Sequence, residues 1–89
     1  FIHMSIRKDY VEGSASSPVG YIEGLFVKPE YRQKGAGTEL YNAGVDWVKK
    51  KGCSEIGTDC TISNNVSFEF LVDMGFEEAN RMICFIKDI

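Results

Sequence analysis

The stretch RQKGAG, residues 32 to 37, constrains the fold most strongly, because it lies where a run typical of a strand gives way to a run typical of a helix. At such a junction the first N–H groups of the helix lack internal partners and carry the positive end of the helix dipole. Gly35 and Gly37 bear no side chain that would keep an anion away, and they allow positive φ angles. Arg32 and Lys34 add positive charge. The stretch therefore predicts a site for a phosphate or pyrophosphate group.

Spacing alone leaves a second interpretation of this loop open, namely a glycine-containing turn whose two cations are simply solvated. The loop lacks the glycine spacings of the GxxxxGK(S/T) and GxGxxG motifs. This difference argues against a nucleoside triphosphatase.

Hydrophobic periodicity predicts strands on the amino-terminal side of the loop and a helix after it. Apolar and polar residues alternate from 1 to 11, and a more continuously apolar run follows from 19 to 27. The two runs are expected to pair as antiparallel strands. After the loop, five residues recur at helical spacing, and Gly52 is expected to end that helix. These five are Leu40, Ala43, Gly44, Trp47 and Val48.

The remainder of the chain predicts a strand at 54–59, a helix at 65–74 and a strand at 81–89. Asn64 is a suitable cap for the second helix and Gly75 a suitable end. A helix between two strands implies a right-handed crossover between parallel neighbours. The expected fold class is therefore α/β, with a mixed sheet flanked by helices.

Composition narrows the function further. The net charge is -3 and the pI is about 5.0, which argues against nucleic acid as a partner and suits a cationic substrate. No apolar run approaches the length of a membrane span, so no membrane association is expected. The three cysteines lack CxxC spacing, so we expect reduced thiols in a cytoplasmic protein and no metal site.

The loop and the second helix resemble the Gcn5-related N-acetyltransferase (GNAT) superfamily. RQKGAG after FVKPEY is similar to its acetyl-CoA signature, R/Q-x-x-G-x-G/A. NNVSFEFLVDMGF resembles its later helix, with Asn64, Gly75 and Phe76 at matching places. The resemblance implies the GNAT fold and acetyl-CoA as the co-substrate.

A narrower resemblance covers nearly the whole chain. Segments such as SIRKDYVEG, EGLFVKPEYRQKG and GFEEANRMICFIK are similar to the aminoglycoside 6'-N-acetyltransferases. Members of that family begin with a further strand, two helices and a strand, so residues 1–89 are expected to form the larger, carboxyl-terminal part of a single GNAT domain. The family also implies a homodimer, and the apolar MICFI run of the last predicted strand agrees with one.

The resemblance assigns the cofactor to two adjoining segments and one further residue. It implies that backbone groups of a splayed strand hold the pantetheine arm and that main-chain N–H groups of the loop hold the pyrophosphate. The strand residues are Leu25, Phe26 and Val27, the loop residues are Arg32, Gln33, Lys34, Gly35, Ala36, Gly37 and Thr38, and the further residue is Asn64.

Two carboxylates are the candidates for catalysis and for binding the amine. Glu23 interrupts an apolar strand, and Asp59 ends the short strand at 54–59, at the edge where α/β sheets bind ligands. A carboxylate can bind a cationic amine and accept its proton before attack on a thioester. Glu23 pointing to solvent and Asp59 capping a turn are the open alternatives. Tyr10 and Glu12 match positions that flank the sugar in the family.

The sequence thus predicts an enzyme that transfers an acetyl group from acetyl-CoA to the 6'-amine of an aminoglycoside. Two alternatives stay open: a GNAT enzyme that acts on another small amine or peptide, and an inactive fragment that binds acetyl-CoA or dimerises. Leu71 stands where many superfamily members have a tyrosine that protonates the departing thiolate. That proton is therefore expected to come from water.

Overall fold

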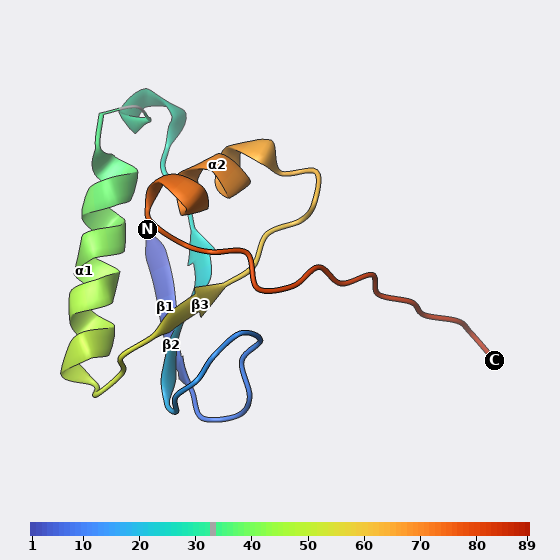
Figure 1. The fold of residues 1–89 in the computed structure, drawn as a ribbon. Coiled ribbons are helices and arrows are strands. Elements are labelled where there is room, and N and C mark those ends of the chain that lie inside the picture. Colours follow the sequence, from blue (N-terminus) through green and yellow to red (C-terminus); the bar gives the residue numbers. More distant parts are fainter. Residues whose placement is uncertain (33) are drawn as a thin grey trace.

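A computed structural model of the chain describes residues 1–32 and 34–89. It has three strands, two α-helices and one short 3-10 helix (Figure 1). In chain order these are β1 Ile2–Arg7, β2 Val19–Leu25, η1 Pro29–Tyr31, α1 Ala36–Lys50, β3 Ile56–Thr58 and α2 Asn65–Asp73.

The sheet has the order β1-β2-β3. β1 and β2 are antiparallel, β2 and β3 are parallel, and α1 forms the crossover between the parallel pair. The predicted antiparallel pair and parallel crossover are confirmed. The strands are shorter than predicted, since β1 ends at Arg7 and β3 has only three residues.

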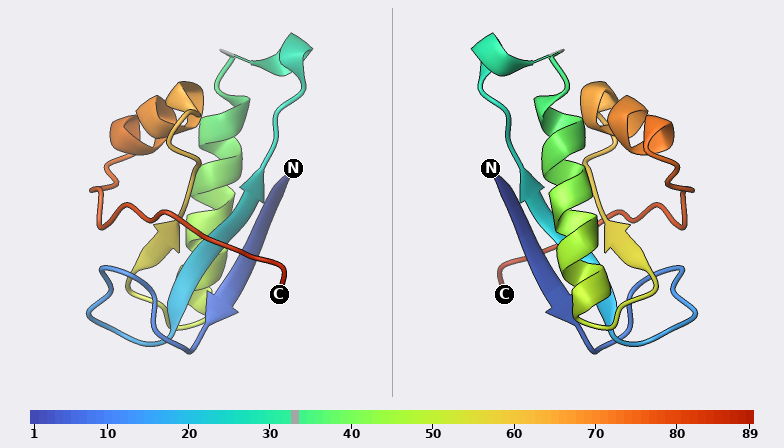
Figure 2. Two further views of the ribbon diagram at one scale, coloured as in Figure 1. Left: turned by 90° about the vertical axis from the view of Figure 1, so that its right-hand side faces the viewer. Right: turned by 90° about the vertical axis from the view of Figure 1, so that its left-hand side faces the viewer.

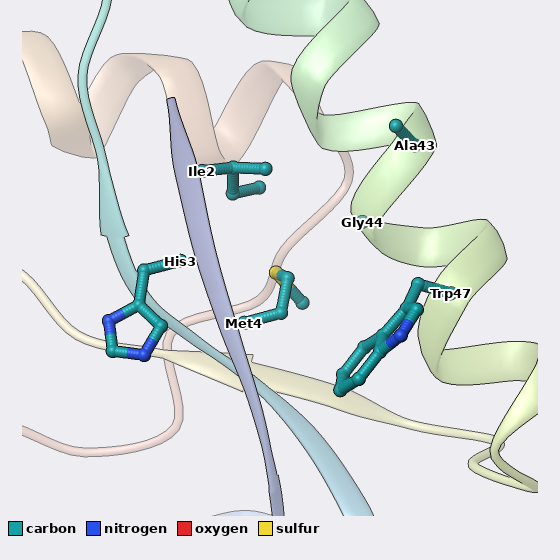
Figure 3. Close-up of a pocket in the computed structure, with 6 residues that line it drawn as sticks. All are labelled: Ile2, His3, Met4, Ala43, Gly44 and Trp47. Carbon is teal, nitrogen blue, oxygen red and sulfur yellow. The ribbon is translucent and has the colours of Figure 1, made fainter.

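α1 covers one face of the sheet, and small residues let it approach closely. A Cβ atom on Gly20 of β2 would lie 2.6 Å from Cγ1 of Val48 on α1, and one on Gly44 would lie 2.9 Å from Sδ of Met4 on β1. Of the predicted helical face, Gly44 and Val48 are buried, whereas Trp47 stays 40% exposed. Trp47 lines a hollow of about 430 Å³ between β1 and α1 (Figure 3).

The helices end near Gly52 and Gly75, and Asn64 caps α2, as predicted, but α1 starts at residue 36, inside the predicted loop. α1 starts after Gly35, whose φ is 85°, and the chain leaves it at Gly52, whose φ is 88°. Asn64 caps α2 by accepting a hydrogen bond from the Ser67 backbone N–H at 3.1 Å, and Gly75 follows with φ of 94°. α2 lies beside the amino-terminal half of α1 (Figure 2), where Phe76 meets Tyr41 edge to face at 5.8 Å.

The predicted strand at 81–89 is wrong. Residues 77–80 pass the loop between β1 and β2, and residues 81–89 then run in an extended path away from the rest of the molecule and pair with no strand of the described chain (Figures 1 and 2). Phe85 and Ile86 are 91% and 98% exposed. The apolar, β-branched pattern reports a preference for extended backbone, but a strand also needs a neighbour whose N–H and C=O groups it can bond. The three-residue β3 offers little length for such pairing.

Candidate active site

The glycine loop, residues 32–37, follows η1 and includes the first two residues of α1. Arg32 opens it and donates from Nε to the Val27 carbonyl oxygen at 2.9 Å, with its guanidinium 5.7 Å from the centre of the Phe26 ring. Arg32 thus ties the loop to the segment that follows β2, and its other guanidinium N–H groups make no hydrogen bond to the residues that the structure describes. Lys34 is exposed, and Gln33 lies outside the described residues.

The two glycines of this loop have different structural roles. Gly35 holds the left-handed conformation that starts α1, and its carbonyl accepts the first helical hydrogen bond, from Glu39 N–H at 3.0 Å. A Cβ there would meet no atom within 4 Å, so the loop is open on this side. A Cβ on Gly37 would lie 3.4 Å from Cε1 of Phe70, so this glycine also makes room for α2. The first N–H groups of α1 therefore sit at an open helix terminus suited to an anion.

The pairing of β2 with β3 stops before β2 ends. Their pairing ends at Ile22 and Thr58, and Thr58 makes a last tie by donating its hydroxyl to the Ile22 carbonyl at 3.0 Å. β2 continues to Leu25, so its last three residues have no β3 neighbour. This open edge is where the resemblance places the splayed strand. Backbone groups along such an open edge can pair with an extended ligand as an added strand would.

Glu23 is the extra residue of a bulge in β2. His3 pairs with Gly24 and Met4 pairs with Ile22, so no β1 residue stands opposite Glu23. Bulges re-aim side chains. Here the carboxylate meets Arg7, whose Nη2 lies 2.8 Å from Oε1 and whose Nε lies 3.1 Å from Oε2.

Ser5 also donates its hydroxyl to Oε2 of Glu23. The hydrogen bond from Arg7, and then that from Ser5, lower the pKa of the Glu23 carboxyl. Glu23 is therefore an ion-paired carboxylate, and its side chain stays 27% exposed. The alternative of a Glu23 side chain that only points to solvent is therefore wrong.

Asp59 directly follows β3 and is exposed. Its Oδ2 accepts a hydrogen bond from the Tyr21 hydroxyl at 2.6 Å. The Tyr21 ring is buried, and the Arg7 guanidinium carbon lies 3.4 Å from its centroid. Burial, and then the hydrogen bond to Asp59, raise the pKa of the Tyr21 phenol to about 12. The phenol therefore remains a proton donor in neutral solution.

The structure brings the two predicted carboxylates to one face of the sheet, opposite α1. We call it the carboxylate face; its members are Ser5, Arg7, Tyr21, Glu23 and Asp59. Two hollows of the described residues, about 430 and 590 Å³, are lined by α1 and lie elsewhere. Glu23 and Asp59 are both exposed, so the carboxylates of this face are open to solvent in the described chain.

Sequence reasoning missed Ser5, Arg7 and Tyr21. The available signal was their spacing, because residues 5 and 7, like 21 and 23, stand two apart and share a strand face. That spacing alone does not tell which strand residues stand opposite each other.

Tyr10 and Glu12 lie in the loop between β1 and β2. Val11 between them is buried with Tyr21 in the small core, so this loop packs near the carboxylate face. Tyr10 is 75% exposed, and Glu12 accepts a hydrogen bond from Nδ2 of Asn80 at 3.1 Å. Their predicted role beside the sugar stays a prediction.

Comparison with protein families identifies the group to which this arrangement belongs. The model of the acetyltransferase (GNAT) family matches residues 1–76. The chain belongs to the GNAT family. The matched residues include β2, the glycine loop and α1, the segments through which the sequence analysis related the chain to this family.

Relatives within the family are similar over nearly the whole chain. The aminoglycoside N(6')-acetyltransferase type 1 of Salmonella typhimurium is 42% identical over 98% of the chain, and that of Acinetobacter baumannii is 39% identical over 99%. The solved structure of AAC(6')-Iy in complex with the bisubstrate analog CoA-S-monomethyl-acetylneamine is 41% identical over 99% of the chain, with a TM-score of 0.91. The chain spans about 60% of the length of each of these proteins.

Proposed function

We infer that the chain belongs to an enzyme that transfers the acetyl group of acetyl-CoA to the 6'-amino group of an aminoglycoside. The observation that carries this function is the open strand edge of β2, which lies between the glycine loop and an exposed carboxylate, Asp59. The β2 edge and the glycine loop suit the extended, anionic co-substrate, and the Asp59 carboxylate suits a cationic amine. The relatives named above support the acceptor.

Acetyl-CoA would bind along the β2 edge and the glycine loop. Backbone groups of Leu25, Phe26 and Val27 suit the amides of the pantetheine arm, and a main-chain N–H near Val27 suits the developing oxyanion. The pyrophosphate fits the N–H groups from Gln33 to Thr38, with Arg32 and Lys34 as added charge. The Oδ1 of Asn64 is used by its helix cap, so its amide nitrogen is the group available to the co-substrate.

The acceptor amine would bind at the carboxylate face. The predicted carboxylates Glu23 and Asp59 both lie on this face, and a carboxylate can take up the proton that the amine nitrogen must lose to attack. The C–N bond forms as the thioester C–S bond breaks, and the electron pair leaves on sulfur. Because the Leu71 side chain has no acidic proton to donate, we assign the protonation of the thiolate to water. Tyr10 and Glu12 are placed to contact the sugar from the neighbouring loop.

Assembly and location complete the proposal. The apolar run within residues 81–89 would be covered in a homodimer, where a second copy can supply the strand neighbour that the segment lacks. Deletion of these residues should then convert a dimer into a monomer in light scattering. The described residues contain no helix long and apolar enough to cross a membrane. Cytoplasmic location and no nucleic-acid partner are consistent with reduced cysteines and a net charge of -3.

Release of coenzyme A thiol tests the function. With acetyl-CoA present, we expect release on addition of neamine, and little release with polyamines or peptides of equal concentration. Release with those amines alone would favour a GNAT enzyme of another specificity. Binding of acetyl-CoA without release with any amine would favour an inactive fragment.

A further inference from the structure

The two carboxylates of the carboxylate face are held in opposite ways. Arg7 bonds both oxygens of Glu23, so the charge of that carboxylate is already compensated. Tyr21 bonds one oxygen of Asp59, Oδ2, and no other donor reaches Asp59 within the part of the chain that the structure describes. Since Asp59 is exposed, its Oδ1 is open to a ligand.

The Tyr21 ring is fixed on both sides. Tyr21 pairs with Gly57 across the parallel strands, and a Cβ atom on Gly57 would lie 3.3 Å from two ring carbons. The ring therefore lies over the bare backbone of Gly57 and carries its hydroxyl toward Asp59, two residues further along the chain. Arg7 stacks over the ring at 3.4 Å.

The hydrogen-bond donors to the two carboxylates also differ in charge, since Arg7 is a cation and Tyr21 is neutral. A cationic donor such as Arg7 orients a carboxylate and cancels its charge. A neutral phenol orients the carboxylate and leaves the charge in place, because the phenol stays protonated at every pH at which the acceptor amine can react. Asp59 therefore keeps the charge that a second cation needs, and Glu23 does not.

We propose that Tyr21 is a positioning residue that fixes the Asp59 carboxylate for the acceptor amine, and that Asp59 rather than Glu23 receives the amine proton. This inference rests on the function proposed above. The proton passes from the amine nitrogen to Oδ1 of Asp59 while that nitrogen attacks the thioester carbonyl carbon. Arg7 serves the same arrangement by occupying Glu23 and covering the Tyr21 ring.

Tyr21→Phe tests this role because it keeps the ring and removes only the hydroxyl. We expect kcat/KM for neamine to fall roughly tenfold or more, the effect of one lost hydrogen bond to a charged group. The KM for acetyl-CoA should be unchanged. Tyr41→Phe is the matched control, because the Tyr41 hydroxyl has no hydrogen bond within the described residues, and it should behave as wild type. Wild-type kcat/KM in Tyr21→Phe would overturn the proposal.

A double-mutant cycle separates positioning from a general structural effect. In an Asp59→Ala background, Tyr21→Phe should cost nothing further, because the hydroxyl has lost the group it orients. A loss as large as in the wild-type background would overturn the proposal.

A wild-type chain that releases no coenzyme A would contradict the proposed function, and the affinity for neamine by calorimetry would then decide the role of Tyr21. Binding weakened about tenfold in Tyr21→Phe would support the positioning role. Equal affinity, or no binding by the wild type, would overturn it.

Discussion

The glycine loop and the carboxylate face differ in the groups they offer to a ligand, backbone N–H groups in the first and side chains in the second. The loop offers backbone N–H groups at the start of α1. Its use as an anion site depends on the absence of a side chain at Gly35, because the space that a Cβ atom would enter is empty. The carboxylate face depends on side chains from β1, β2 and the end of β3, which meet only because the strands pair in one register. Substitutions in the first region should therefore change cofactor affinity, and substitutions in the second should change turnover of the amine.

The strongest test of this division is Asp59→Asn, which keeps the shape of the side chain and removes its charge. We expect kcat/KM for neamine to fall roughly 10²-fold, within the usual range for a positioned base. The affinity for acetyl-CoA, measured by calorimetry, should not change. Asp46→Asn, on the exposed surface of α1, is the matched control. Normal activity of Asp59→Asn from pH 6 to 9 would reduce Asp59 to a turn residue.

Gly35→Val tests the other region. A side chain at Gly35 would fill the open space in front of the α1 N–H groups, so acetyl-CoA binding should weaken at least tenfold, or about 1.4 kcal/mol. Valine at the positive φ of residue 35 is also strained, so the variant could lose affinity through lost stability alone, and a control is needed.

Gly52→Val supplies that control. Gly52 has a φ of 88° and no neighbouring atom within 4 Å of a built Cβ, as at Gly35, but it lies at the opposite end of α1. We expect similar loss of thermal stability in both variants and loss of calorimetric affinity in Gly35→Val alone. Unchanged affinity in Gly35→Val would remove the loop from the cofactor site.

Glu23→Gln should have the smallest effect on turnover, a few-fold loss in kcat/KM, because Arg7 already compensates the charge. Its clearer signature is in stability. Since the folded-state pKa of Glu23 is lowered, the ion pair stabilises the fold above the ordinary pKa of glutamate and ceases to do so as the pH falls through the lowered value.

The melting temperature of Glu23→Gln should therefore lie below that of wild type near pH 7, and the gap should close in acid. Glu55→Gln is a useful comparison, because the pKa of Glu55 is also lowered, by hydrogen bonds from Ser16 and the Ala15 backbone. It should show a similar dependence on pH with normal turnover. A gap that widens in acid would contradict the ion pair.

The contrast between the regions also explains what the sequence could predict. The loop was predictable from local sequence. It contains Gly35 and Gly37, and around them the spacing of apolar residues changes from that of a strand to that of a helix. Glu23 and Asp59 were predictable as polar residues in and directly after strands, but their partners were not. The bulge at Glu23 shifts the β1–β2 register by one residue, and the Asp59 partner depends on how β2 and β3 pair. Arg7 and Tyr21 become visible only once the strands are paired.

The last predicted strand failed for a related reason. Residues 81–89 have the composition of a strand, but a pairing partner is a property of the fold or the assembly, and the described chain supplies none. Local pattern therefore predicted α1, α2 and the two longer strands well, whereas it could not predict contacts that depend on distant residues.

The most direct test of the account is the position of the acetyl group in the product. The protein is incubated with acetyl-CoA and either neamine or a matched aminoglycoside that carries a hydroxyl in place of the 6'-amine, and the products are analysed by NMR. We predict one acetyl group on the 6'-nitrogen of neamine and no product from the 6'-hydroxyl compound. Acetylation at another amine, or equal reaction of both compounds, would contradict the proposed function.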